Sequence, residues 1–228
     1  MSIKRVFFSA FTGLFFLGIG TASAQFSRPI SIGAGGGASM GVMDLPSEGP
    51  KFLFYGEVDF QITPFISIGA HGEKGRFSGV ADANSFENNY YAGNFNLKVR
   101  LGQFLGKASN FALSSLQGST LSTIFDNIYI GAGGGLIKNR TRRYVKGTYA
   151  EKLKSNGGEL SRNLGEIGLI IPLNVGVDIP LGTSFYGPRW AVNLNYQHTF
   201  PLSDNLDGIL IGENDQYRVI SVGIKYAL

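Results

Sequence analysis

Two acidic residues two positions apart, Glu57 and Asp59, are the most suggestive chemical groups in the sequence. Paired carboxylates serve as general acid and base in many hydrolases. In the β-strands that the sequence predicts, the cations Lys98, Arg100 and Lys225 occupy the polar strand face, as the two carboxylates do. Their side chains therefore point into the same interior. Charges in a tight interior are stable only when they are paired. We therefore predict a lumenal charge network of these five residues rather than an acid–base pair.

Other catalytic and metal-binding groups are scarce. The sequence has two histidines, His71 and His198, and no Cys, which excludes disulfides, thiolate metal sites and a catalytic thiol. A zinc site needs three or four ligands, which would have to be mostly carboxylates. His198 is placed where an enzyme acting on lipid acyl chains would work, but position 200 is Phe200 and not a serine nucleophile. We predict no catalytic residue, no metal site and no cofactor.

Two glycine-rich segments, 33–37 and 131–135, superficially resemble phosphate-binding loops. A dinucleotide fingerprint needs a helix that opens directly after the glycines, and a P-loop needs Gly-Lys followed by Ser or Thr. Neither feature is present. We interpret the glycines as small strand residues that leave room for bulky side chains from across a narrow lumen.

The N-terminal residues 1–24 have the form of an export signal. Lys4 and Arg5 precede an apolar run over 6–19, and Ala22-Ser23-Ala24 has the small-x-small pattern of a cleavage site. This run is shorter than the roughly 20 residues of a spanning helix. We predict a removed Sec signal peptide and one domain over 25–228. The remaining basic residues are scattered, which argues against a nucleic-acid partner.

Beyond the signal, the chain alternates apolar and polar residues in segment after segment. In the last segment Ile220, Val222 and Ile224 share one parity, while Ser221 and Lys225 share the other. Such alternation gives a strand one apolar and one polar face. The eight predicted strands cover 30–42, 52–62, 65–75, 90–101, 128–138, 165–179, 190–200 and 217–228. Most of them are long enough to cross a bilayer, which takes about 9 to 11 tilted residues.

The aromatic residues distinguish a soluble barrel from a membrane barrel. A membrane barrel turns its apolar face to lipid and carries aromatic girdles at both interfaces. We predict such a girdle at the strand ends, made of Tyr91, Trp190, Phe200 and Tyr226, with Val, Ile, Leu, Ala and Gly in the strand middles. The predicted fold is an all-β, eight-stranded antiparallel up-and-down transmembrane barrel, and a secreted soluble barrel is the alternative.

Four segments carry a family resemblance: the terminal strand 217–228, the segment 126–135, and the stretches 205–208 and 214–217. With them the chain resembles the small eight-stranded outer-membrane β-barrels of Gram-negative bacteria, the porin-like group related to the OmpA transmembrane domain. The resemblance implies an outer-membrane location, both termini in the periplasm, and a monomer. It also implies insertion by machinery that reads the terminal strand. That strand usually ends in Phe or Trp, whereas this chain ends in Leu228, with Tyr226 and Ile224 in the alternate positions.

The implied topology assigns each connection to one side of the membrane. The predicted extracellular loops are 43–51, 76–89, 139–163 and 201–216, and the predicted inner connections are 63–64, 103–126 and 181–186. The segment 103–126 is the longest inner connection and is predicted to form a short helical periplasmic connector with Asn110 as an N-cap. It either covers the inner mouth of the barrel or binds a partner.

The two largest predicted loops carry opposite charge. Loop 139–163 has seven basic and two acidic residues, a net charge of +5, and loop 201–216 has four acidic residues and no basic one. We predict that Arg140, Arg142, Arg143 and Arg162 contact lipopolysaccharide phosphates, the alternative being solvated loops. The acidic loop either offsets its neighbour or binds divalent cations, although it matches a calcium loop only in part.

Eight strands enclose an interior just wide enough to be filled by side chains. We therefore predict an outer-membrane barrel that is not an enzyme, with a plugged lumen and a structural or interaction role through its extracellular loops. A narrow solute channel is the main alternative, and a lipid-modifying outer-membrane enzyme is a weaker one. The predicted partners are outer-membrane lipid and lipopolysaccharide.

Overall fold

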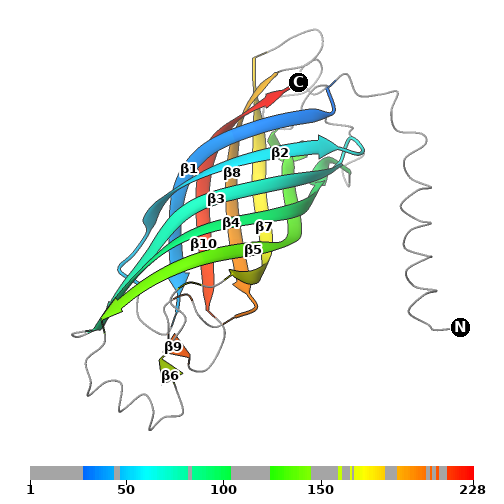
Figure 1. Cartoon of the computed structure of the whole chain (residues 1–228). Helices are drawn as coiled ribbons and strands as arrows, with labels where there is room; N and C mark the ends of the chain where they lie inside the picture. The colour runs from blue at the N-terminus through cyan, green and yellow to red at the C-terminus, as the bar shows by residue number, and fades with distance from the viewer. Residues whose placement is uncertain are drawn as a thin grey trace, which may run out of the picture.

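The chain forms a closed antiparallel β-barrel, described here from a computed structural model (Figure 1). The structure describes residues 28–43, 47–81, 84–103, 124–144, 159–160, 165, 167–182, 189–203, 206, 209–210 and 215–228. The barrel strands are β1 (Ile30–Val42), β2 (Lys51–Gln61), β3 (Ile66–Ala81), β4 (Asn84–Arg100), β5 (Ile128–Tyr144), β7 (Ile167–Leu181), β8 (Trp190–Pro201) and β10 (Gln216–Ala227). Each strand pairs with its neighbours in sequence, and β10 closes on β1. The predicted eight-stranded up-and-down barrel is confirmed.

The remaining described elements are short. Strand β6 (Glu159–Leu160) pairs with β9 (Ile209–Leu210) in a separate two-stranded sheet, and η1 (Leu101–Gln103) is one turn of 3-10 helix after β4. Within the described part of the chain, no helix is long and apolar enough to cross a membrane. The predicted signal peptide, and residues 104–123 of the predicted connector with Asn110, lie outside the described residues.

The two ends of the barrel differ in their connections. At the terminal end, where β1 begins and β10 ends, β2 turns directly into β3. The hydroxyl of Thr63 accepts hydrogen bonds from the amides of Phe65 (3.3 Å) and Ile66 (3.0 Å), which closes this turn. At the opposite end, called the far end below, β3, β4 and β5 project past the other strands (Figure 1).

Strand alternation gives the barrel an apolar outer belt and a polar interior. Strand β10 alternates buried and exposed residues along nearly its whole length, with Ile220 66% and Ile224 54% exposed. The belt also contains aromatic residues away from the strand ends, such as Phe54 (64% exposed) and Phe95 (69%). The prediction that strand middles carry only aliphatic and small residues is therefore wrong.

Two predicted loop boundaries are also wrong. Strands β3 and β4 pair without interruption up to Ala81 and Asn84, so most of 76–89 is strand and not loop. Strand β5 likewise continues to Tyr144 and pairs with β4 as far as Ser85, so the first residues of the predicted loop 139–163 are strand as well.

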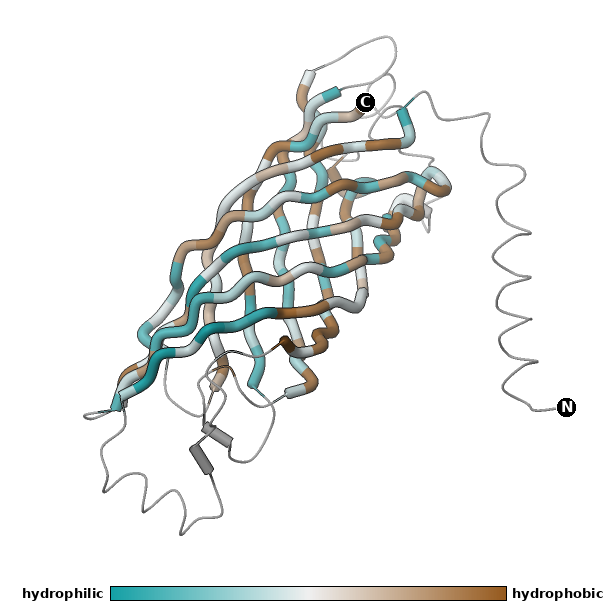
Figure 2. The backbone as a smooth tube through the Cα atoms, viewed as in Figure 1, coloured by the Kyte–Doolittle hydropathy of each residue, from teal (hydrophilic) through white to brown (hydrophobic). Residues whose placement is uncertain are grey.

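The reason for both errors is a reversal of the alternation at the far end. There the apolar side chains Phe77, Phe86 and Tyr90 point inward and are almost fully buried, while Arg76 and Glu87 point outward. The outward side chains therefore change from apolar to polar toward the far end, where the tube of β3, β4 and β5 also becomes more hydrophilic (Figure 2). The strands are predicted from an apolar outer face, so each of these predicted strands ends close to the residue where this face becomes polar.

Candidate functional site

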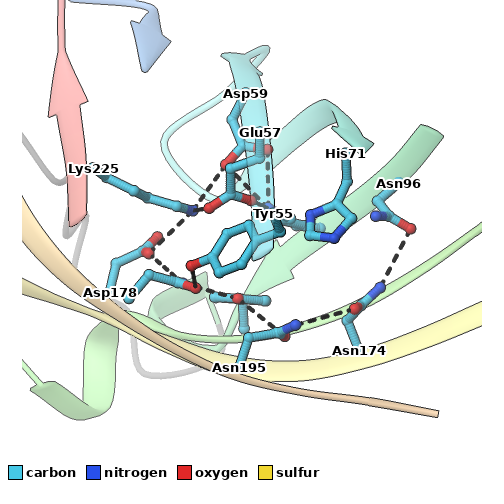
Figure 3. A network of polar contacts seen from close by, with 12 residues as sticks. Tyr55, Glu57, Asp59, His71, Asn96, Asn174, Asp178, Asn195 and Lys225 are labelled. Atoms are coloured by element: carbon cyan, nitrogen blue, oxygen red, sulfur yellow. Dashed lines mark hydrogen bonds and ion pairs between the residues drawn. The ribbon is translucent and has the colours of Figure 1, made fainter. Parts of the chain in front are cut away.

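The interior near the terminal end is occupied by charged side chains from four strands. Lys98 Nζ lies 2.7 Å from Glu57 Oε2 and 2.9 Å from Asp59 Oδ1. Lys225 Nζ lies 3.1 Å from Glu57 Oε1 and 2.9 Å from Asp59 Oδ2 (Figure 3). All four side chains are less than 8% exposed. The structure thus brings β2, β4 and β10 together through two cations and two carboxylates.

Asp178 on β7 is the member of this network that the sequence analysis did not include. Its Oδ2 lies 3.2 Å from Arg100 Nη2, and its Oδ1 lies 3.2 Å from Lys225 Nζ. Among the described residues, Arg100 joins the network through Asp178 and forms no ion pair with the β2 carboxylates. With Asp178 the network has three anions and three cations, so the buried group is electrically neutral.

Two tyrosines lie against this network and fill the cross-section. The Lys98 and Lys225 ammonium groups lie 5.3 and 5.7 Å from the ring centre of Tyr129, within cation–π range. Tyr55 fits against glycine, since a Cβ on Gly35 would lie 2.7 Å from its ring and 2.5 Å from the Cα of Gly223. This geometry supports the interpretation of the glycine-rich strands as packing space.

An amide ladder continues the polar interior toward the middle of the barrel. Asn174 donates to Asn96 at 3.2 Å, Asn195 donates to Asn174 at 3.5 Å, and Asn193 donates to Asp178 at 2.8 Å (Figure 3). The amides link the charge network to β8, and they connect β7 to β4 across the intervening strand β5.

A small cavity lies between the charge network and the terminal end. Its volume is about 10 Å³, and its lining includes Ser67, Arg100 and Asp178. A space of this size is close to the minimum that holds one water molecule. Arg100 Nε and Nη1 are buried and have no hydrogen-bond partner among the residues that the structure describes.

A second, mainly apolar layer fills the far end. The rings of Phe77, Tyr90 and Tyr217 pack together with centroids 4.4 to 5.4 Å apart. Leu206, in the connection after β8, is 1% exposed and belongs to the same cluster. Its carbonyl accepts hydrogen bonds from Asn88 (2.5 Å) and Thr141 (3.0 Å), which fixes this connection against the inner wall.

A buried carboxylate connects the two layers. Glu73 accepts a hydrogen bond from the Tyr217 hydroxyl at 3.1 Å and lies 3.4 Å from His71 Nε2. His71 in turn stacks on Tyr55, with ring centroids 5.2 Å apart. Both histidines therefore have structural partners, because His198 on the outer wall bonds Gln216 and packs on Phe200. Among the described residues, no cluster of His, Asp and Glu could hold a metal ion.

The predicted lipopolysaccharide-contacting arginines do not all share one surface. Arg140 and Arg142 lie on the exposed outer face of β5. Arg143 lies on the opposite face because side chains alternate along a strand, so it does not point toward lipid. Arg162 lies outside the described residues.

The four predicted girdle residues all lie on the outer wall. Trp190 and Tyr226 pair across β8 and β10 at the terminal end, with ring centroids 4.7 Å apart. Tyr91 and Phe200 lie nearer the far end, where Lys74 Nζ approaches the Tyr91 ring to 5.1 Å from its centre. The four residues thus mark two levels, with the apolar belt between them.

The rim of the far end is held by polar contacts. Ser78 donates to Glu48 at 2.5 Å, and Lys51 Nζ lies 3.2 Å from the same carboxylate. The Ser78 hydroxyl, followed by Lys51, lowers the pKa of Glu48 below its ordinary value. These contacts fasten the chain before β2 to the projecting wall of β3.

Comparison with solved structures places this geometry in a known fold. The chain is similar to Neisserial surface protein A, NspA, with a TM-score of 0.50 and 11% identity over 88% of this chain and 97% of that one. It is also similar to the attachment invasion locus protein Ail of Yersinia pestis in complex with sucrose octasulfate, a heparin analogue (TM-score 0.48, 9% identity, 87% and 97% covered). A third neighbour is the outer membrane protein OprG of Pseudomonas aeruginosa (TM-score 0.38, 10% identity, 90% and 98% covered).

The likeness to NspA and the closed antiparallel topology together give this chain the fold of the small eight-stranded outer-membrane β-barrels. No protein-family model matches the sequence, and no curated protein matches it. The comparison therefore defines the fold of this chain and not its role.

Proposed function

We propose that this protein is an outer-membrane barrel closed to solutes, with a structural or interaction role at the cell surface. The main support is the electrically neutral network in the interior. In this network Lys225 contacts three carboxylates from two strands, Glu57 and Asp59 on β2 and Asp178 on β7. Buried ion pairs hold charged side chains in fixed positions, because breaking one leaves an uncompensated charge. A solute crossing the barrel has to displace this network.

The outer surface supports a membrane location. Large apolar residues on every barrel strand are exposed, including Phe95 (69%), Ile167 (62%) and Ile220 (66%). A soluble protein rarely exposes a contiguous apolar surface of more than a few hundred Å². An apolar belt around a polar interior is the arrangement that a lipid environment favours.

The surface available for interaction is at the far end. Strands β3 and β4 carry their paired backbone well past the apolar belt, and their polar outer faces are built to meet water and headgroups. We assign the interaction role to this projecting wall and to the connections beside it, rather than to loops alone.

Cell fractionation tests the location, and planar-bilayer recording tests the closure. The proposal expects the protein in the outer-membrane fraction, extracted only by detergent, and a purified barrel without steady conductance. A protein that is soluble without detergent contradicts the membrane assignment. Steady porin-scale conductance favours the alternative of a solute channel.

A further inference from the structure

A group of basic side chains lies on the outer face of the projecting wall, at the edge of the apolar belt nearest the far end. Strand pairing puts Lys74, Tyr91 and Lys138 in one row across β3, β4 and β5. The next row outward contains Arg76, Asn89 and Arg140. Arg142 lies in the row after that, beside Glu87. The five basic residues all have exposed side chains.

This group, the basic wall, carries an excess of positive charge. Glu87 is the one acidic residue among the three rows of β3, β4 and β5 just given, and it pairs with Arg76 at 3.4 Å. Lys74, Lys138, Arg140 and Arg142 form no ion pair with any residue that the structure describes. Four cations therefore face outward without a carboxylate partner in that part of the chain.

The basic wall directly adjoins residues that face lipid. On β5, Lys138 follows Leu136 on the same outer face, and on β4 Tyr91 precedes Phe95 on its outer face. Leu136 is 52% exposed and Phe95 is 69% exposed. The colour change along these strands in Figure 2 follows the same boundary. The cations thus lie at the height at which a lipid headgroup meets its acyl chains.

A groove beside β5 gives part of this surface a defined shape. Lys138, Arg140 and Arg142 line it together with Gly165 and Ile167, and its volume is about 570 Å³. Among the described residues that line the groove, none carries a negative charge. The groove can therefore accommodate an anionic group between three basic side chains.

We propose that the basic wall binds the phosphate groups of outer-leaflet lipid, the phosphorylated lipid A portion of lipopolysaccharide. Guanidinium groups bind phosphate through paired charge-assisted hydrogen bonds, and lysines add point charge. A soluble polyanion would not need cations placed directly beside an apolar belt. This inference rests on the proposed outer-membrane location and adds the site, its residues and its ligand class.

The test uses the full folded barrel in nonionic detergent, with bisphosphorylated lipid A and chemically dephosphorylated lipid A as probes. The wild type is expected to bind the phosphorylated form more tightly by roughly tenfold or more. The double variant Lys138→Gln with Arg140→Gln is expected to lose most of that preference. Equal binding of the two probes by the wild type overturns the proposal.

Two single variants give a matched control. Arg140→Gln removes an arginine of the basic wall, and Arg218→Gln removes an outward arginine of β10 whose strand neighbours are Met40 and His198. Only Arg140→Gln is expected to weaken lipid A binding, and Arg140→Lys should restore part of it. Equal effects of the two Gln variants contradict a defined site. This pair also replaces the double variant if that variant does not fold.

A soluble competitor separates lipid from other polyanions. If a sulfated oligosaccharide displaces lipid A completely at equal phosphate and sulfate concentration, the wall takes soluble polyanions and the lipid assignment is wrong. The proposed outer-membrane location is tested separately by cell fractionation. It is wrong if the protein is soluble without detergent. A membrane-located barrel with no phosphate preference overturns only the present inference.

Discussion

Lys225 Nζ lies 3.2 Å from Asp178 Oδ1, so the last strand of the barrel is joined to β7 across the intervening strand β8. The same ammonium group contacts Glu57 and Asp59 on β2. This one lysine therefore links the last strand, β10, to β2 beyond the closure with β1 and to β7 on the other side. Loss of its partners should affect the whole terminal half of the barrel.

The first prediction concerns the two β2 carboxylates. The double change Glu57→Gln with Asp59→Asn leaves Lys98, Arg100 and Lys225 facing Asp178 alone. Breaking a buried pair commonly costs about 3 to 5 kcal/mol. The variant is expected to lose its folded, heat-modifiable gel migration at a lower temperature, or to admit water and show measurable conductance.

Val58→Thr is the control for that variant, because Val58 lies between the two carboxylates but faces outward and is 49% exposed. It is expected to leave both the temperature of the migration change and the conductance near wild type. A double variant that is as heat-resistant and as tight as its parent would show that the pairs do not stabilise the interior.

The second prediction tests the coupling of Arg100 to Asp178. Asp178→Asn removes the carboxylate partner of Arg100 and one partner of Lys225, and should lower the unfolding midpoint in urea. Adding Arg100→Gln should recover part of the loss, since it removes the unpaired cation. A double-mutant cycle measures the coupling, with about 0.5 to 3 kcal/mol expected for groups in contact. Strict additivity of the two changes would contradict the pairing.

The third prediction uses two glycines on opposite faces. Gly35→Val places side-chain atoms against the Tyr55 ring and the β10 backbone, so it should reduce the yield of folded barrel strongly. Gly134→Val adds the same atoms to the outer face of β5, where nothing lies within 4 Å of a Cβ. That variant should fold like the wild type, as measured by heat-modifiable migration. Equal yields of the two variants would contradict the inward packing of Tyr55.

The fourth prediction concerns the far-end layer. Leu206→Ala should open space in the aromatic cluster and cost about 2 to 5 kcal/mol of local stability. Hydrogen exchange of amides in 84–90 and 139–142 should become faster. Leu202→Ala removes a side chain of the same connection that is 54% exposed, and it should leave exchange unchanged. Unchanged exchange in the Leu206 variant would mean that this connection does not seal the far end.

Much of the fold follows from alternation alone, because a strand between lipid and a polar interior must alternate at every residue. Because Glu57 and Lys98 alternate with apolar residues along their strands, their positions alone predict that both side chains point into the barrel. Asp178 had the same inward parity in the segment 165–179 and was missed because it had no acidic neighbour two residues away. A search for every inward charge, rather than for pairs, would have included it.

The far end was harder to predict for a physical reason. Beyond the membrane, water replaces lipid outside the wall, so Phe77 and Phe86 turn inward and the pattern reverses. The position of Leu206 was also out of reach, since its contacts with Asn88 span 118 residues of sequence. Such a contact depends on the finished barrel and has no local sequence signal.

Conductance of the purified wild-type barrel in a planar lipid bilayer distinguishes a closed interior from a solute channel. With Lys98 and Lys225 paired to carboxylates across the lumen, and with Leu206 packed at the far end, no continuous aqueous path is expected. We expect conductance that is absent or far below that of a porin. Steady, porin-scale open levels from protein with folded, heat-modifiable migration would contradict the closed interior and favour a solute channel.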